Sequence, residues 1–159
     1  MATPALRPEL EVSLHLAVLE AARRGHPYAG LEHLLFALLH DDATAATIEA
    51  AGARADRLRR RLERYLDEEL RTGAGVPIDS STPTLAFRRA VQQAALQALR
   101  SGREEVTGAH VLVAMWDEED SFAVHFLQEA GADRMELMRR ASAGVPEAVP
   151  AGVEEDEEE

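Results

Sequence analysis

At 159 residues the chain has the length of a single domain that can bury a substantial core, and Ala and Leu outnumber the 4% of aromatic residues, which favours packed helices. The net charge of −12 opposes a nucleic-acid-binding surface, because affinity for nucleic acid comes largely from cations that meet phosphates. All 17 basic residues are Arg and there are no cysteines, which excludes a lysine phosphate-binding loop, Schiff-base chemistry and disulfides, and favours a reducing cytoplasm.

Four helices are predicted in the first half of the chain. Apolar residues recur at spacings of three and four, and the predicted ranges are 8–24, 30–40, 43–51 and 55–70. The second range contains the longest apolar run, which is too short to span a bilayer at roughly 20 residues and is typical of a buried helix. Pro8 fits a first turn, Asp41 or Asp42 can cap the third helix, and Gly25 and Gly52 are stop signals.

The fourth predicted helix carries an unusual concentration of Arg. Five residues fall mostly off its leucine row and are mixed with acids: Arg57, Arg59, Arg60, Arg61 and Arg64. One interpretation is a patch that binds anions. The other is a solvated face with ion pairs between residues i and i+4, which is the ordinary arrangement on an exposed helix.

Four more helices are predicted in the second half, after a Gly- and Pro-rich loop over residues 72–83. Their approximate ranges are 85–100, 108–116, 122–130 and 133–142, with Thr84, Thr107 and Asp120 or Ser121 as caps. No strand is expected: residues 1–7 are predicted to be a loose start, and 104–106 a turn. Residues 143–159 hold seven acids and no Arg, which predicts a disordered acidic tail or linker.

The two halves are related by a fixed offset of 77 positions, as for His33 and His110. The same offset relates Leu10 to Phe87, Leu14 to Val91, Ala17 to Ala94, Ala21 to Ala98, and Gly25 to Gly102. Several matches at one offset indicate a duplicated unit. We therefore predict an all-α domain over residues 1–142, with eight helices in two pseudo-symmetric repeats of four, over about 8–71 and 84–142.

Candidate catalytic and metal-binding groups are few. Neither an H-E-x-x-H metal motif nor a G-x-S-x-G serine motif occurs, and we expect no catalytic, cofactor or metal site. His33 and His40 are seven residues apart and could share a helix face with His15 as a further ligand, so a small metal-binding protein stays an alternative. In the first turn of an apolar helix, His33 and His110 are more typical of packing or capping.

Glu32 is the exception in the central apolar run. A carboxylate in the first turn of a helix is favoured by the helix dipole, which is one interpretation of this residue. The other is an acidic contact for a cationic partner. The second repeat has Ala109 at the equivalent position, so only one of the two pseudo-symmetric ends could offer this carboxylate.

The run Glu32-His33-Leu34-Leu35-Phe36-Ala37-Leu38-Leu39 resembles the E-H-L-L-x-A-L-L signature of the Clp N-terminal domain, which sits at the front of Clp-type AAA+ unfoldases. Three segments are similar to the ClpA branch in particular, namely residues 9–14, 83–89 and 101–114. The resemblance covers about Glu9 to Ser142. It implies an eight-helix repeat pair that acts as a docking module and is not catalytic by itself.

In the ClpA branch this domain is tethered above a hexameric ATPase ring, receives the adaptor ClpS with N-degron substrates, and the ring feeds unfolded chain to ClpP. By position, the adaptor-facing residues of that branch correspond to Glu32, Thr84, Leu85 and Arg89, and the adjacent Arg88 is included as well. The resemblance implies ATP and Mg²⁺ in the ring domains only, and protein partners rather than nucleic acid or membrane. It further implies a cytoplasmic location and a monomeric isolated domain.

Two departures from the family pattern limit what carries over. Gly30 stands where ClpA-type chains often have a Thr cap, and Ala109 departs from the ClpC branch, in which both repeats carry the Glu and bind phosphoarginine. Because the AAA+ ring needs a phosphate-binding loop, we expect either a fragment that ends in an acidic linker or a stand-alone Clp N-domain protein. The latter would regulate adaptor or substrate access.

Overall fold

The computed structural model describes residues 4–70, 76–118 and 120–143. Its helices are α1 (Pro8–Arg23), α2 (Leu31–Leu38), α3 (Asp42–Ala50), α4 (Ala55–Arg64), α5 (Leu85–Arg100), α6 (Gly108–Met115), α7 (Phe122–Glu129) and α8 (Arg134–Ala143). The predicted all-α fold of two four-helix repeats is thereby confirmed. Of the expected tail over residues 143–159, only Ala143 lies within the described residues, as the last residue of α8.

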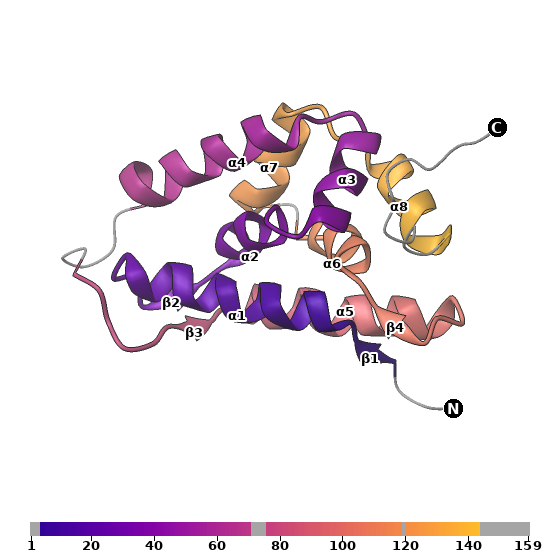
Figure 1. The fold of residues 1–159 in the computed structure, drawn as a ribbon, viewed down its shortest axis with the longest axis horizontal. Coiled ribbons are helices and arrows are strands. Elements are labelled where there is room, and N and C mark those ends of the chain that lie inside the picture. Colours follow the sequence, from indigo (N-terminus) through magenta and orange to yellow (C-terminus); the bar gives the residue numbers. More distant parts are fainter. Residues whose placement is uncertain (1–3, 71–75, 119, 144–159) are drawn as a thin grey trace.

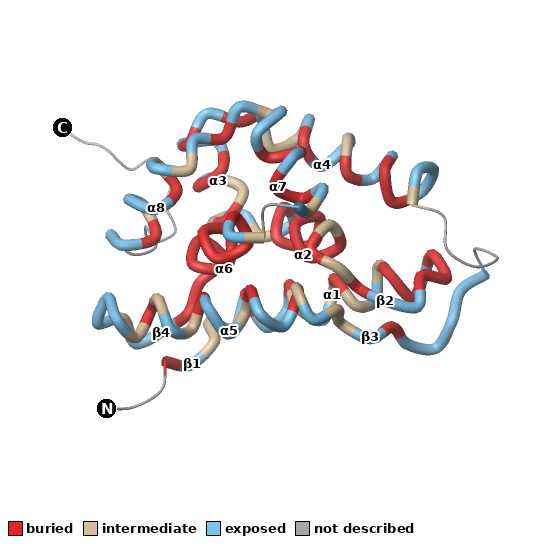
Figure 2. The backbone as a smooth tube through the Cα atoms, turned by 180° about the vertical axis from the view of Figure 1, so that it is seen from behind, coloured by how far each residue is buried: buried red, intermediate tan, exposed pale blue. Residues whose placement is uncertain are grey.

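The helices form three layers, with α2 and α6 in the middle (Figure 1). Helices α1 and α5 lie on one side of this pair, and α3, α4, α7 and α8 lie on the other. Every residue of α6 is buried, as is every residue of α2 except Glu32 (Figure 2). The apolar runs that were predicted to be buried helices therefore form the centre of the core. No helix in the described ranges has the length and apolar composition that crossing a membrane requires.

The predicted caps begin the helices as expected. Four side chains accept a hydrogen bond from the backbone N–H three residues on: Asp41 at α3, Thr84 at α5, Thr107 at α6 and Ser121 at α7. The stop glycines Gly52 and Gly131 have φ angles of 108° and 93°. They also face each other where the two repeats meet, since a side-chain carbon added to Gly52 would lie 3.0 Å from the Gly131 carbonyl oxygen.

Four two-residue strands were missed: β1 (Ala5–Leu6), β2 (Tyr28–Ala29), β3 (Thr82–Pro83) and β4 (Glu105–Val106). β1 pairs with β4 and β2 with β3, both in parallel. The prediction of a loose start was therefore wrong for residues 5 and 6, with residues 1–3 outside the described residues, and the prediction of a mere turn at 104–106 was wrong as well. Strands this short cannot show the period-two alternation by which strands are predicted. Each pair joins the two repeats, because the segment before the first helix of one repeat bonds to the segment before the central helix of the other.

The fourth predicted helix also differs in its last turn. It ends at Arg64 and continues as a π-helical turn, η1 (Tyr65–Glu69), in which Leu70 N donates to Tyr65 O at 2.7 Å. The wider turn allows the adjacent Tyr65 and Leu66 both to be buried. A pattern of leucines four residues apart predicts a regular helix and gives no sign of this change.

Helix α2 is expected to be essential for stability. Leu35 in α2 is 0% exposed, so Leu35→Ala should lower the free energy of unfolding by about 2–5 kcal/mol in urea denaturation. Leu19→Ala on α1 removes the same atoms from a side chain that is 62% exposed, and should cost about 0.5 kcal/mol or less. Equal losses in the two variants would contradict a central role for α2.

Candidate functional site

Glu32 is half-buried in the first turn of α2 and contacts another helix. Its Oε2 accepts a hydrogen bond from Ala123 N at 3.2 Å, in the first turn of α7. A carboxylate at this position satisfies a backbone donor that the helix itself leaves free, and it interacts favourably with the helix dipole. Glu32 therefore lies in the first turn of α2, as the dipole interpretation requires, and also bonds to α7, which the sequence did not indicate. Oε2 is the oxygen used, and Oε1 has no hydrogen bond within the described residues.

The start of α5 lies beside the start of α2. Thr84 N donates to Ala29 O at 2.9 Å, and Thr84 Oγ1 accepts from Phe87 N at 3.1 Å. A side-chain carbon added to Gly30 would lie 3.2 Å from Glu32 Oε1 and 3.9 Å from Thr84 Cγ2. The structure therefore brings together Glu32 and Thr84, which are 52 positions apart in sequence. Leu85, the next residue, is 61% exposed.

The two candidate arginines differ in their contacts. Arg89 Nε and Nη2 donate to the two carboxylate oxygens of Glu118 at 2.8 and 2.6 Å. The hydrogen bond from Arg89 lowers the pKa of Glu118, and Glu118 raises the pKa of Arg89. Arg88 is exposed and makes no ion pair with any residue that the structure describes. Glu118 is a partner of the site that sequence reasoning missed.

An exposed aromatic residue completes this surface. Phe122 directly follows the α7 cap, is 53% exposed, and lies next to the Ala123 N–H that Glu32 binds. Its ring centroid is 5.4 Å from that of Tyr65. Burial, followed by the charges of Glu32 and Glu69, raises the pKa of Tyr65 to about 12, so this side chain is neutral at physiological pH. An aromatic residue after a helix cap, in a chain with only four Phe, was the available signal for Phe122.

We call this surface the Glu32 face and define it by Glu32, Thr84, Leu85, Arg88, Arg89, Glu118 and Phe122. A hollow of about 480 Å³ adjoins it, lined by Ala86, Asp117, Glu118, Asp120 and Ser121. The face combines exposed apolar groups with a carboxylate and an ordered ion pair. Exposed apolar groups beside ordered charges are typical of surfaces at which proteins bind one another.

The equivalent end of the second repeat is different. There Ala109 replaces Glu32, and a cavity of about 630 Å³ opens beside it, with Arg7, Leu10, Asp41 and Thr47 among its lining residues. A carboxylate that could reach across to α3 is missing, and α3 is capped from within by Asp41. The two ends therefore differ: at one end the Glu32 carboxylate bonds to α7, and at the other a cavity lies beside Ala109.

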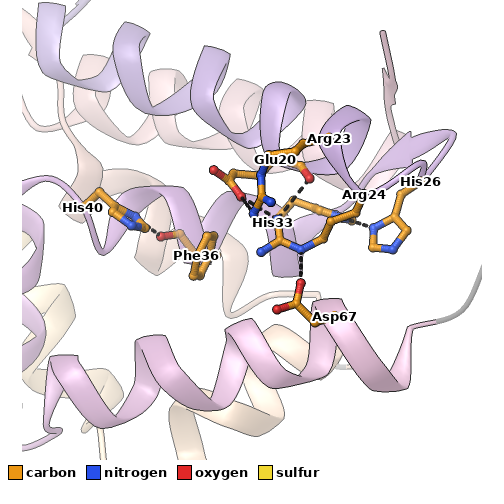
Figure 3. A network of polar contacts seen from close by, with 8 residues as sticks. All are labelled: Glu20, Arg23, Arg24, His26, His33, Phe36, His40 and Asp67. Atoms are coloured by element: carbon orange, nitrogen blue, oxygen red, sulfur yellow. Dashed lines mark hydrogen bonds and ion pairs between the residues drawn. The ribbon is translucent and has the colours of Figure 1, made fainter. Parts of the chain in front are cut away.

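His26 and His33 are buried and hydrogen-bonded to each other, and we call this pair the histidine relay (Figure 3). His33 Nδ1 accepts from Gly30 N at 3.0 Å, so a neutral His33 carries its hydrogen on Nε2. This Nε2–H donates to His26 Nδ1 at 2.9 Å. Gly30 offers no capping side chain, and His33 provides the compensating contact at the start of α2. His110 makes the same contact with Thr107 N at 3.0 Å, which confirms the capping interpretation of both residues.

The ring nitrogens of His33 are both used, and His40 Nδ1 instead bonds to Phe36 O at 2.9 Å. His33 and His40 therefore do not form the shared face that a metal site would need. Across the described residues, no group of three or more His, Asp or Glu is placed to hold a metal ion.

Arg24 lies near this relay and connects three elements that surround it. Its Nε donates to Asp67 Oδ1 of η1 at 2.6 Å, and its Nη1 bonds to Glu20 (Figure 3). The guanidinium carbon also lies 5.4 Å from the centroid of the Phe36 ring. These contacts tie the end of α1 to η1 and α2. Burial, followed by the charges of His26 and Arg24, lowers the pKa of His33 to about 3.

The fold is an all-helical domain built from two repeats. The sequence profile of the Clp repeat (R) N-terminal domain family matches residues 6–130, so the chain belongs to this family. A ClpA homolog protein of Fuscovulum blasticum is 38% identical over 143 residues, which cover 89% of this chain. The chain spans 18% of the length of that relative.

Solved structures of Clp N-terminal domains share the fold. The Hsp104 N-terminal domain of Candida albicans superposes with a TM-score of 0.72 at 15% identity, covering 86% of this chain and 89% of that one. The N-terminal domain of ClpD from Arabidopsis thaliana gives 0.65 at 17% identity, with 90% and 96% covered. That of the ClpV1 ATPase from E. coli gives 0.64 at 22%, with 91% of each chain covered.

The histidine relay predicts a loss of stability in mild acid. The ordinary pKa of His is 6.5, and that of His33 is lowered to about 3 in the folded state, so the unfolded chain binds more protons between these values. The free energy of unfolding should therefore fall as the pH drops from about 6.5 towards 3. Urea denaturation at a series of pH values measures this directly.

His33→Gln is expected to flatten this dependence above pH 4.5. Below that pH the Glu side chains also take up protons, because 4.5 is the ordinary pKa of Glu and residues such as Glu20 have a lowered pKa in the folded state. His15→Gln changes an exposed histidine and serves as the control. If the two substitutions flatten the profile equally, the relay is not the source of the pH dependence.

Proposed function

We propose that the chain is the adaptor- and substrate-docking N-terminal domain of a ClpA-like ATP-dependent unfoldase. The observation that carries this is the Glu32 face, in which the candidate residues from α2 and α5 are adjacent although they come from different repeats. Membership of the Clp repeat family and the 38% identity to a ClpA homolog support the same role.

In this proposal the domain receives a ClpS-type adaptor that carries N-degron substrates, and the ring to which it belongs delivers unfolded chain to ClpP in the cytoplasm. The ring is a homohexamer that holds ATP and Mg²⁺. This chain supplies recognition only, because the Glu32 face offers contacts for a protein and no paired nucleophile and base.

The chemistry of the Glu32 face fits a protein partner with an apolar patch and a nearby donor. Leu85 and Phe122 provide the apolar area that drives association. Glu32 Oε1 can accept a hydrogen bond from the adaptor while Oε2 keeps its bond to Ala123 N. The Arg89–Glu118 pair is already ordered, so its side chains lose little freedom on binding. Arg88 can pair with an acid on the partner.

Titration calorimetry with a ClpS-type adaptor tests the docking role. Leu85→Ala should weaken binding at least about fivefold, as expected when an apolar contact near the centre of an interface is removed. Leu96→Ala on the same helix truncates a side chain that is 39% exposed near the other end of α5, and should leave the affinity unchanged.

Glu32 needs two variants because it also contacts α7. Glu32→Ala should weaken adaptor binding and lower the free energy of unfolding by about 0.5–2 kcal/mol, the usual cost of losing a carboxylate cap. Glu32→Gln keeps an oxygen for Ala123 N and should weaken binding with a smaller loss of stability. Wild-type affinity in both Glu32 variants and in Leu85→Ala would contradict the assignment of the Glu32 face.

A further inference from the structure

Helix α4 carries a row of arginines on one side, in a chain whose net charge is −12. We call this row the arginine stripe and define it by Arg54, Arg57, Arg61 and Arg64. The spacings of three and four residues place these side chains on one face of the helix. The side chain of Arg61 is 30% exposed, and the other three are exposed.

The stripe is poorly neutralised by its neighbours. Arg54 lies 3.8 Å from Asp56, and Arg61 donates to Glu69 at 2.9 Å. Arg57 and Arg64 form no ion pair with any residue in the described ranges. On α4 the one pair at the i, i+4 spacing joins Arg60 and Asp56 at 3.6 Å, again counting described residues alone. A face of mutual ion pairs, the ordinary interpretation of this sequence, therefore does not account for the stripe.

The stripe borders a small pocket between α4 and α7. The pocket has a volume of about 240 Å³ and is lined by Arg54, Arg57, Leu58, Arg61, Phe126, Glu129 and Ala130. The Arg61 guanidinium lies 4.6 Å from the centroid of the Phe126 ring, a cation–π contact that holds the positive charge beside an apolar floor. Cations above an apolar floor suit a ligand that presents carboxylates next to an apolar side chain.

We propose that the arginine stripe binds an extended acidic segment of a protein partner, with an apolar side chain of that segment seated in the pocket between α4 and α7. Ten residues separate Arg54 from Arg64, which is about 15 Å along a helix. An extended peptide covers this length in about five residues. The arginines attract the acidic side chains of the segment, and the pocket accommodates its apolar side chain.

A polypeptide fits this surface better than nucleic acid. The net charge of −12 repels a long polyanion, and Glu129 lies within the pocket itself. A peptide of four acids around one apolar residue has much less charge to be repelled and fills the pocket floor. The stripe lies on α4, whereas Leu85 lies on α5 in the opposite outer layer (Figure 1). The two surfaces adjoin at α7, where the Phe122 and Phe126 ring centroids are 6.2 Å apart. This inference rests on the arginines of the stripe, so it goes beyond the adaptor-docking role and does not depend on it.

Fluorescence anisotropy with a labelled Glu-Glu-Leu-Glu-Glu peptide tests the inference on the full chain at low salt. Arg57→Glu should weaken binding at least about fivefold, because it reverses an unpaired charge at the pocket rim. Arg100→Glu reverses another exposed arginine that makes no ion pair with a described residue, at the end of α5, and should change the affinity less than about twofold. Leu85→Ala should not affect this probe, which separates the result from the adaptor test.

Three outcomes would overturn the proposal. Equal losses with Arg57→Glu and Arg100→Glu would show unspecific attraction. Tighter binding of a single-stranded oligonucleotide of equal charge, lost on Arg57→Glu, would identify a nucleic-acid site. A several-fold gain in peptide affinity when the acids of residues 154–159 are changed to Gln or Asn, absent when Arg57→Glu is also present, would identify the chain's own acidic segment, in place of a partner, as the occupant of the stripe.

Discussion

The burial of α2 and α6 between two outer layers is the constraint from which the rest of the structure follows. Every residue of α6 is buried, and Glu32 is the one residue of α2 that is not. A partner cannot reach the middle layer along its length, so binding groups can lie only at helix starts or on the outer helices. The Glu32 face satisfies this restriction, because it combines the start of α2 with the starts of α5 and α7.

The starts of the central helices are held by contacts between the repeats as well as within them. The two strand pairs join each central helix to the other repeat, and His33 and His110 bind the backbone just before α2 and α6. This symmetry makes the difference at Glu32 and Ala109 informative. The same backbone supports a carboxylate that reaches α7 at one end and a cavity of about 630 Å³ at the other. Duplication thus produced two equivalent positions, and the side chains there have diverged.

The parts of the fold that could be predicted depend on local pattern. The caps at Thr84, Thr107 and Ser121 and the capping roles of His33 and His110 follow from residues close in sequence, and the duplication follows from comparing the two halves of the chain at one offset. The contacts that could not be predicted join distant residues. Glu32 and Ala123 are 91 positions apart, and the strands that pair are too short to show a period. For the same reason the resemblance to the ClpA branch implied that Glu32 and Arg89 share a docking surface, but the sequence gave no sign of the bond between Arg89 and Glu118.

The charges of this acidic chain divide according to whether the fold already uses them. Arg24 and Arg89 are bound to carboxylates and help to hold helices together, and Glu32 both caps α7 and presents a free oxygen. Changing any of these is therefore expected to alter stability, whatever its effect on binding. Arg57 and Leu85 have no such structural task, since Arg57 forms no ion pair with any described residue and Leu85 is a largely exposed apolar side chain. Substituting an exposed residue that the fold does not need can change binding without changing stability. Arg57 and Leu85 are such residues, so they distinguish the two proposed surfaces most cleanly.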